Sequence, residues 1–273
     1  MSAVEGSGHA GDTGRFRQRD ADVEAAFFLP FLQQGMTLLD AGCGPGPITC
    51  GLAERVAPGH VTGVDADPAR IETASSYASD AGTGNVAFLV ADVIDLPFDD
   101  AVFDAVFANG LIEHLPDPHK GLAEMKRILK PEGVIGVRSP DWGSALLQPD
   151  AEPLRHSISL RNRLQRHRGG HPEAGRRLRG LLIEAGFLGV SAGASTESHG
   201  ADDEIAEGAR YMHSILDDPE LARLAREHGW ASVDEIEEMR LAWTAWAAQP
   251  GAFAAFFWCH ATGRAPTTPP TTP

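Results

Sequence analysis

The chain has 273 residues, of which 42% are apolar and 22% charged, a balance typical of an ordinary globular protein. Its formal net charge of −15 disfavours a polyanionic partner such as nucleic acid. The apolar runs are shorter than the roughly eighteen residues of a membrane span, and residues 1–20 lack the apolar core of a signal peptide. We therefore expect a cytoplasmic protein without a membrane partner.

Strand and helix patterns alternate over the first half of the chain. A lead-in helix broken near Pro30 is expected over residues 14–32. Apolar runs typical of buried strands follow at 36–42, 60–66, 85–92, 103–110 and 133–139. Helix patterns lie between them at 48–57, 67–82 and 117–133. Asp67 and Pro68 are typical of a helix start, and Pro131 and Gly133 of a helix end. This alternation predicts a parallel sheet with helices on both faces.

The second half is less regular. Residues 140–172 are basic and show no clear period, whereas a helix, a strand, two or three helices and a last strand are predicted at 173–185, 187–195, 201–248 and 252–264. The whole pattern predicts an α/β fold: a Rossmann-like, doubly wound, mostly parallel sheet of seven strands with an inserted helical lid before the last strand. The predicted parts are a flexible N-terminus (1–14), a core (15–199 and 250–265), an inserted helical cap (200–249) and a disordered tail (266–273).

Charge is concentrated in two segments of the second half. Residues 155–180 hold eight arginines and one acid, Glu173, whereas residues 201–240 hold twelve acids and four arginines. Two interpretations remain open. The segments are either solvated faces that pair with each other, or the arginine segment holds an anionic substrate.

Cysteine and histidine spacing predicts neither a disulfide framework nor a metal site. The three cysteines have no metal-type pair spacing: Cys43, Cys50 and Cys259. His167 and His171 have the spacing of helical metal ligands, but Gly169, Gly170 and Pro172 disfavour a helix there. We therefore predict no metal.

A glycine-rich turn directly follows the first predicted strand, in LLDAGCGPG at residues 38–46. In an open parallel sheet, ligands bind beyond the carboxyl ends of the strands. The dinucleotide fingerprint is Gly-x-Gly-x-x-Gly, but here the third glycine, Gly46, comes one residue early and Pro47 takes the last place. The spacing therefore disfavours a nicotinamide cofactor.

This motif, with VTGVDADP, NVAFLVADVIDLPF and FDAVFANGLIEHLPDPHKGLAEMKRILKPEGVIGV, resembles the class I S-adenosylmethionine-dependent methyltransferases. The resemblance covers residues 36–139 and is closest to the ubiquinone/menaquinone-biosynthesis-like (methyltransferase type 11/25) branch. It implies S-adenosyl-L-methionine as cofactor and methyl transfer to the O, N or C atom of a small-molecule acceptor, in secondary metabolism.

The resemblance also implies which residues hold the cofactor. Asp40 would face its ammonium or sulfonium, Asp65 would accept from the ribose hydroxyls, and Ala66 would pack on the adenine. Asp92 would accept from the adenine amino group, and Asn109 would lie near the methyl group. The predicted cofactor-binding residues are Asp40, Gly42, Cys43, Gly44, Gly46, Asp65, Ala66, Asp92, Val93 and Asn109.

Two residues are candidates for catalysis. His114 is the candidate base, with a structural histidine of the LIEHLPDP turn as the alternative, and Glu113 is interpreted as a helix or surface acid. Arg138, Asp141 and Trp142 follow the fifth strand, where we expect the acceptor, and Asp141 is the second catalytic candidate. Arginines of the lead-in segment are expected near the cofactor carboxylate: Arg15, Arg17 and Arg19.

Two alternatives keep the same cofactor motifs. One is a non-methylating enzyme, such as a cyclase, that uses the bound cofactor as a structural or electrostatic aid. The other is a non-enzymatic cofactor-binding protein. The expected partner is a small-molecule substrate, with neither nucleic acid nor membrane, and a homodimer is compatible with the sequence.

Overall fold

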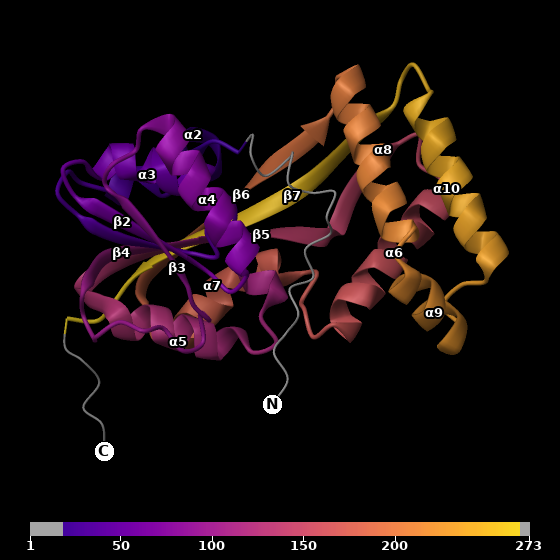
Figure 1. The fold of residues 1–273 in the computed structure, drawn as a ribbon. Helices are drawn as coiled ribbons and strands as arrows, with labels where there is room; N and C mark the ends of the chain where they lie inside the picture. Colours follow the sequence, from indigo (N-terminus) through magenta and orange to yellow (C-terminus); the bar gives the residue numbers. More distant parts are fainter. Residues whose placement is uncertain (1–18, 268–273) are drawn as a thin grey trace. The chain divides into compact units, whose positions relative to one another are not determined.

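The computed structural model describes residues 19–267 and contains a seven-stranded sheet of order β3-β2-β1-β4-β5-β7-β6 (Figure 1). Strand β1 (Thr37–Ala41) pairs in parallel with β2 (His60–Asp65) and with β4 (Phe103–Asn109). Parallel pairs also join β2 to β3 (Val86–Val90) and β4 to β5 (Leu129–Gln148). The other strands are β6 (Leu188–His199) and β7 (Phe253–Arg264). The predicted α/β class and the mostly parallel sheet are thus confirmed.

Several predicted features lie outside the described residues. They are the flexible N-terminus at 1–14, Arg15, Arg17 and most of the predicted tail at 266–273. Among residues 19–267, no helix combines the length and the apolar character that crossing a membrane requires.

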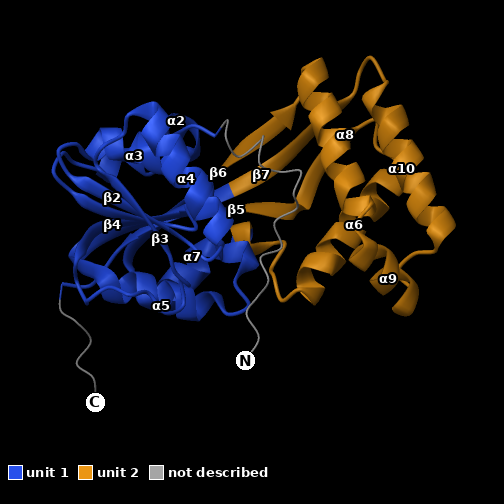
Figure 2. Ribbon diagram, viewed as in Figure 1, with its two compact units in different colours: residues 1–139, 176–193, 259–273 blue, residues 140–175, 194–258 orange. Residues whose placement is uncertain are grey.

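The chain forms two compact units (Figure 2). Unit 1 comprises residues 1–139, 176–193 and 259–273, and unit 2 comprises residues 140–175 and 194–258. The segment predicted as an inserted cap, 200–249, is therefore part of a larger compact unit that also includes residues 140–175. Its role as a cap stays a prediction.

The helices of unit 1 begin and end at residues with clear capping chemistry. The side chain of Asp67 accepts from the N–H of Ala69 at 2.9 Å, Pro68 opens α4 (Pro68–Ala81), and Gly82 closes it at a φ of 70°. The lead-in segment, predicted as one helix broken near Pro30, holds only the short α2 (Ala21–Glu24) and a 3₁₀ turn, η1 (Leu29–Phe31), which contains Pro30; the helix therefore ends earlier than predicted, at Glu24. The remaining elements are α3 (Pro47–Val56), η2 (Ile112–His114), α5 (Pro118–Ile128) and α7 (Ala174–Glu184), which extends across the boundary between the units.

Unit 2 is built around four helices: α6 (Glu152–His167), α8 (Asp202–Leu216), α9 (Pro219–Glu227) and α10 (Val233–Ala247). Trp243 is fully buried among them and donates to the hydroxyl of Ser157 at 2.8 Å. Because α6 ends at His167, the two histidines at 167 and 171 do not share a helix, as the intervening glycines predict.

The structure corrects two expectations about local structure. Residues 152–167, which show no clear period in the sequence, form α6, because Leu154, Ile158 and Leu164 make a buried stripe among polar residues. Strand β5 begins at Leu129 and runs to Gln148, well beyond the predicted 133–139, and α5 ends before Pro131. A register shift against β4 accommodates the proline and Gly133 within the strand.

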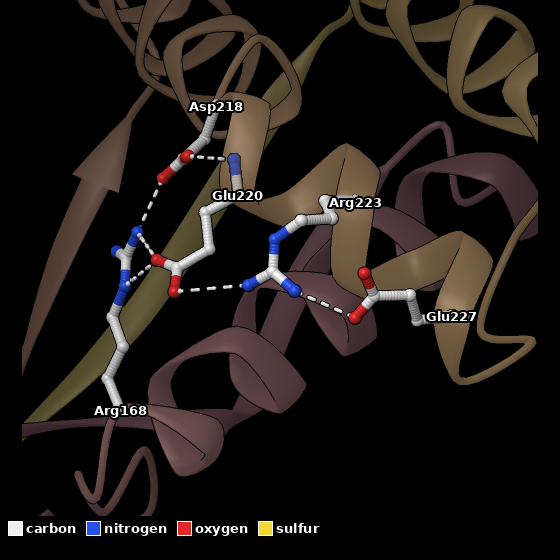
Figure 3. A network of polar contacts seen from close by, with 5 residues as sticks. All are labelled: Arg168, Asp218, Glu220, Arg223 and Glu227. Atoms are coloured by element: carbon white, nitrogen blue, oxygen red, sulfur yellow. Dashed lines mark hydrogen bonds and ion pairs between the residues drawn. The ribbon is translucent and has the colours of Figure 1, made fainter.

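Part of the basic segment pairs with the acidic segment inside unit 2 (Figure 3). The guanidinium of Arg168 lies 2.7 Å from the Asp218 carboxylate and 2.6 Å from that of Glu220. Asp218 also accepts from the N–H of Glu220 at 2.8 Å and so caps α9. Arg223 continues the network to Glu227 at 2.7 Å. The interpretation that the two segments pair is therefore confirmed for Arg168.

Candidate cofactor-binding site

The glycine-rich turn follows β1 and leads into α3. Gly42, Gly44 and Gly46 have φ values of 73°, 54° and 90°, in the left-handed region that favours glycine. A Cβ at Gly46 would lie 2.9 Å from the Cβ of Ala74, so packing excludes a side chain there. A Cβ at Gly44 would meet nothing within 4 Å. Gly44 thus leaves open space beside the backbone, which fits the close approach of a ligand.

Asp65, the last residue of β2, is tied to this turn. One carboxylate oxygen accepts from the N–H of Gly44 at 3.0 Å, and the other accepts from the N–H of Asp67 at 3.0 Å. Arg70 lies 3.7 Å away. A carboxylate has about four acceptor positions, so these two bonds leave Asp65 able to accept from the two hydroxyls of a ribose.

Asp40 has a partner within the protein that the sequence does not reveal. Its carboxylate is 2% exposed and accepts from the hydroxyl of Thr49 at 2.7 Å, which links β1 to α3. Burial raises the pKa of Asp40 to about 7, a nearby Asp65 charge adds to the rise, and the Thr49 hydrogen bond opposes it. Burial likewise raises the pKa of the Cys43 thiol, which therefore stays neutral. Both residues support the turn from within the core.

Three predicted adenine contacts come from the ends of β2 and β3. Ala66 is exposed, whereas Val93 is buried. Asp92 is exposed and its carboxylate accepts from the N–H of Ile94 at 3.1 Å. The parallel register pairs Asp65 with the last residue of β3, so these side chains follow neighbouring strand ends. The arrangement combines an apolar surface with a carboxylate that retains acceptor positions, which fits an adenine and its amino group.

A polar cluster lies where the end of β4 pairs with the middle of β5. Asn109 is buried, and its side-chain oxygen accepts from Arg138 at 3.2 Å. Arg138 also forms an ion pair with Glu24. Burial lowers the pKa of Arg138 to about 10, while the Glu24 charge opposes this. The Asn109 Nδ2 is fully buried and donates to no described residue. Since such an unpaired group costs about 1–3 kcal/mol, this position fits an acceptor atom of a bound molecule.

The catalytic candidates lie in different units. His114 belongs to η2 of unit 1, its side chain is 53% exposed, and its Nε2 lies 3.9 Å from a carboxylate oxygen of Glu113. Asp141 belongs to unit 2, is buried, and accepts from the N–H of Gly143 at 3.0 Å. Their catalytic roles stay predictions.

Glu113 lies in the 3₁₀ helix η2, but its interpretation as a surface acid is wrong. Its side chain is buried and accepts from the Ser139 hydroxyl at 2.7 Å. The two residues are 26 positions apart, and the η2 turn after β4 brings Glu113 to Ser139 in the middle of β5. Nothing local in the sequence indicates this partner.

Comparison with known proteins gives the family. Residues 32–186 match the family described as methyltransferase domain, which is more than half of the chain. The chain belongs to this family. The predicted resemblance to class I S-adenosylmethionine-dependent methyltransferases is therefore confirmed, although these matches do not single out the quinone-biosynthesis branch.

The relatives of this methyltransferase-domain chain match it over part of their length. An uncharacterised methyltransferase of Schizosaccharomyces pombe is 32% identical over 178 residues, covering 62% of this chain and 63% of the relative. The nocamycin O-methyltransferase of Saccharothrix syringae is 34% identical over 122 residues, 44% of each chain. The chain thus spans less than two thirds of the length of the curated relatives that it matches.

A solved structure supports the fold of this methyltransferase-domain chain. The YcgJ protein from Bacillus subtilis superposes with a TM-score of 0.59 at 18% sequence identity. The superposition covers 89% of this chain and 98% of the other. The predicted Rossmann-like architecture is therefore confirmed.

Proposed function

We propose that this protein transfers a methyl group from S-adenosyl-L-methionine to an O, N or C atom of a small organic acceptor. The observation that carries the proposal is the contact between Asp65 and Gly44. It places a carboxylate with spare acceptor positions beside a glycine whose missing side chain leaves open space. Membership of the methyltransferase-domain family supports the same conclusion.

When bound, S-adenosyl-L-methionine supplies a methyl group already activated by its sulfonium. The protein then has to bind the cofactor and the acceptor, orient them toward each other and exclude water. Asp65 would hold the ribose, Asp92 the adenine amino group, and Ala66 the adenine face. The buried Nδ2 of Asn109 would donate to an acceptor atom near the amino-acid end of the cofactor, where Arg138 adds a positive charge.

His114 is proposed as the residue that takes a proton from the acceptor. Its half-exposed imidazole follows β4, and Glu113 is close enough to influence its orientation. A positioned base of this kind contributes about 10²–10⁴-fold to rate. An acceptor with an acidic hydroxyl or carbon needs such a base, whereas an amine nucleophile does not.

The biological setting belongs to the proposal as well. We propose a role in secondary metabolism, because the matched relatives include the nocamycin O-methyltransferase and other O-methyltransferases. The proposal also includes a cytoplasmic location and a small-molecule substrate. We do not favour the cyclase alternative, because relatives such as the nocamycin O-methyltransferase are named as methyltransferases.

Formation of S-adenosylhomocysteine tests the proposal. The protein is incubated with S-adenosyl-L-methionine and a panel of phenols, carboxylic acids and amines, and the demethylated cofactor is measured by mass spectrometry. We expect formation that depends on one class of acceptor. Tight cofactor binding with no turnover across the panel would favour a non-methylating role. Absence of cofactor binding would contradict both the methyltransferase and the non-methylating role.

A further inference from the structure

The basic segment at 155–180 contains one arginine whose surroundings differ from those of its neighbours. Arginines of this segment that form ion pairs within unit 2 are Arg155, Arg166 and Arg168. Arg161, on α6, is 9% exposed, yet no carboxylate of the described residues pairs with its guanidinium. A buried cation without a counter-charge is costly, so Arg161 needs an explanation.

The guanidinium of Arg161 is held by neutral groups. Its Nη1 donates to the side-chain oxygens of Asn162 at 3.0 Å and Gln165 at 2.7 Å. Its Nε donates to the hydroxyl of Tyr211 at 3.3 Å. The group stacks over the Trp142 ring at 3.9 Å from the centroid. These contacts fix its position and orientation but leave its charge uncompensated.

The other terminal nitrogen of Arg161 is available to a ligand. Nη2 donates to no described residue. The fully buried, unpartnered polar atoms of the described chain are those of Asn109 and His171, so Nη2 is reached by solvent. The unpartnered Nε2 of His171 belongs to the segment whose Pro172 carbonyl accepts from the N–H of Trp142 at 3.0 Å. This part of unit 2 therefore has two unmatched polar groups.

Aromatic rings provide an apolar surface beside the cation. Trp142 stacks with Tyr211 at a centroid distance of 5.7 Å and an interplanar angle of 22°. It also contacts Phe256 at 4.9 Å. All these residues belong to unit 2, and Trp142 is only partly buried. A planar, unsaturated group would pack favourably on such a surface.

We propose that Arg161 and the aromatic residues beside it bind the carboxylate and the planar body of an organic acid within unit 2. Arginine is suited to carboxylates because its N–H groups are held in a fixed plane. One open nitrogen matches a carboxylate better than a phosphate dianion, which is usually held by more donors. Binding of the acid does not depend on the proposed function.

A pair of probes that differ in charge tests this site in the full chain. Binding of trans-cinnamate and of cinnamamide is followed by tryptophan fluorescence and calorimetry. We expect cinnamate to bind at least about ten-fold more tightly than cinnamamide, because only cinnamate carries a carboxylate that can pair with the guanidinium of Arg161. Arg161→Gln should remove this preference. Arg163→Gln is the matched control, because it removes the same charge from an exposed position of the same helix.

Equal affinity of the unaltered protein for cinnamate and cinnamamide would overturn the proposal. An undiminished preference of Arg161→Gln for cinnamate would also overturn it. If Arg161→Gln fails to fold by circular dichroism, Arg161→Lys and the comparison of probes on the unaltered protein decide. S-adenosyl-L-methionine is titrated into the same sample. Cofactor binding without preference for cinnamate overturns only the acid site, and preference without cofactor binding overturns the proposed function.

Discussion

Replacing Gly44 and Gly46 in turn by alanine should separate cofactor binding from folding. Both glycines have positive φ values, 54° and 90°, so alanine costs about 1–2 kcal/mol of folding free energy at either position. At Gly46 the new Cβ would also lie 2.9 Å from the Cβ of Ala74 and 3.2 Å from the Phe88 ring. Overpacking of this kind adds about 1–3 kcal/mol. At Gly44 the Cβ meets no protein atom within 4 Å and would instead occupy the space left for the ligand.

The two variants are compared by urea unfolding and by calorimetric titration with S-adenosylhomocysteine. We expect Gly44→Ala to lose about 1–2 kcal/mol of stability and at least about ten-fold in affinity, since 1.4 kcal/mol corresponds to a factor of ten. Gly46→Ala should lose about 2–5 kcal/mol of stability. Gly44→Ala binding as tightly as the unaltered protein would refute the assignment of Gly44 to the ligand. Equal stability of the two variants would refute the packing argument.

Three further predictions concern stability. Trp243→Phe should cost about 2–4 kcal/mol, because it leaves a cavity and removes the indole N–H that donates to the buried Ser157 hydroxyl, which still donates to the Leu154 carbonyl. In a double-mutant cycle with Ser157→Ala, the two losses should fall short of additivity by about 1 kcal/mol, and strict additivity would contradict this. Arg168→Ala should lower the free energy of unfolding by about 1–2 kcal/mol. Arg155→Ala, whose ion pair is about half exposed, should lower it by less than about 0.5 kcal/mol. Denaturant midpoints measure both losses, and equal losses would contradict the prediction. The pKa of Asp40 rises from 3.8 to about 7, so between these pH values the folded state binds more protons than the unfolded state and stability falls as pH rises. Asp40→Asn should abolish this decline in unfolding free energies measured from pH 4 to 8, and an unchanged slope would argue against a buried, protonated Asp40.

The first half of the fold could be predicted because its signals are local. Asp67, Pro68 and Gly82 mark the ends of α4 by their own backbone and capping preferences. The glycine-rich turn also lies where the apolar run of β1 predicts it. The resemblance of the motifs at successive strand ends to a known family then implies the candidate cofactor residues without knowledge of any contact.

The rest depends on partners that are distant in sequence. The burial of Glu113 depends on Ser139, and the role of Asp40 in the core depends on Thr49. The α6 helix is not predicted, because its segment is rich in polar and basic residues. The helical spacing of Leu154, Ile158 and Leu164 would have indicated it.

Titration of S-adenosyl-L-methionine into the unaltered protein, Asp65→Asn and Asp67→Asn tests whether Asp65 holds the cofactor. Asp65→Asn removes the carboxylate that accepts from Gly44, whereas Asp67→Asn removes a neighbouring charge and keeps a residue suited to cap α4. We expect binding by the unaltered protein and at least about ten-fold weaker binding by Asp65→Asn, which is about 1.4 kcal/mol or more. For Asp67→Asn we expect no more than about a two-fold change in affinity. Absence of binding by the folded, unaltered protein, or equal affinity in all three, would contradict this role of Asp65.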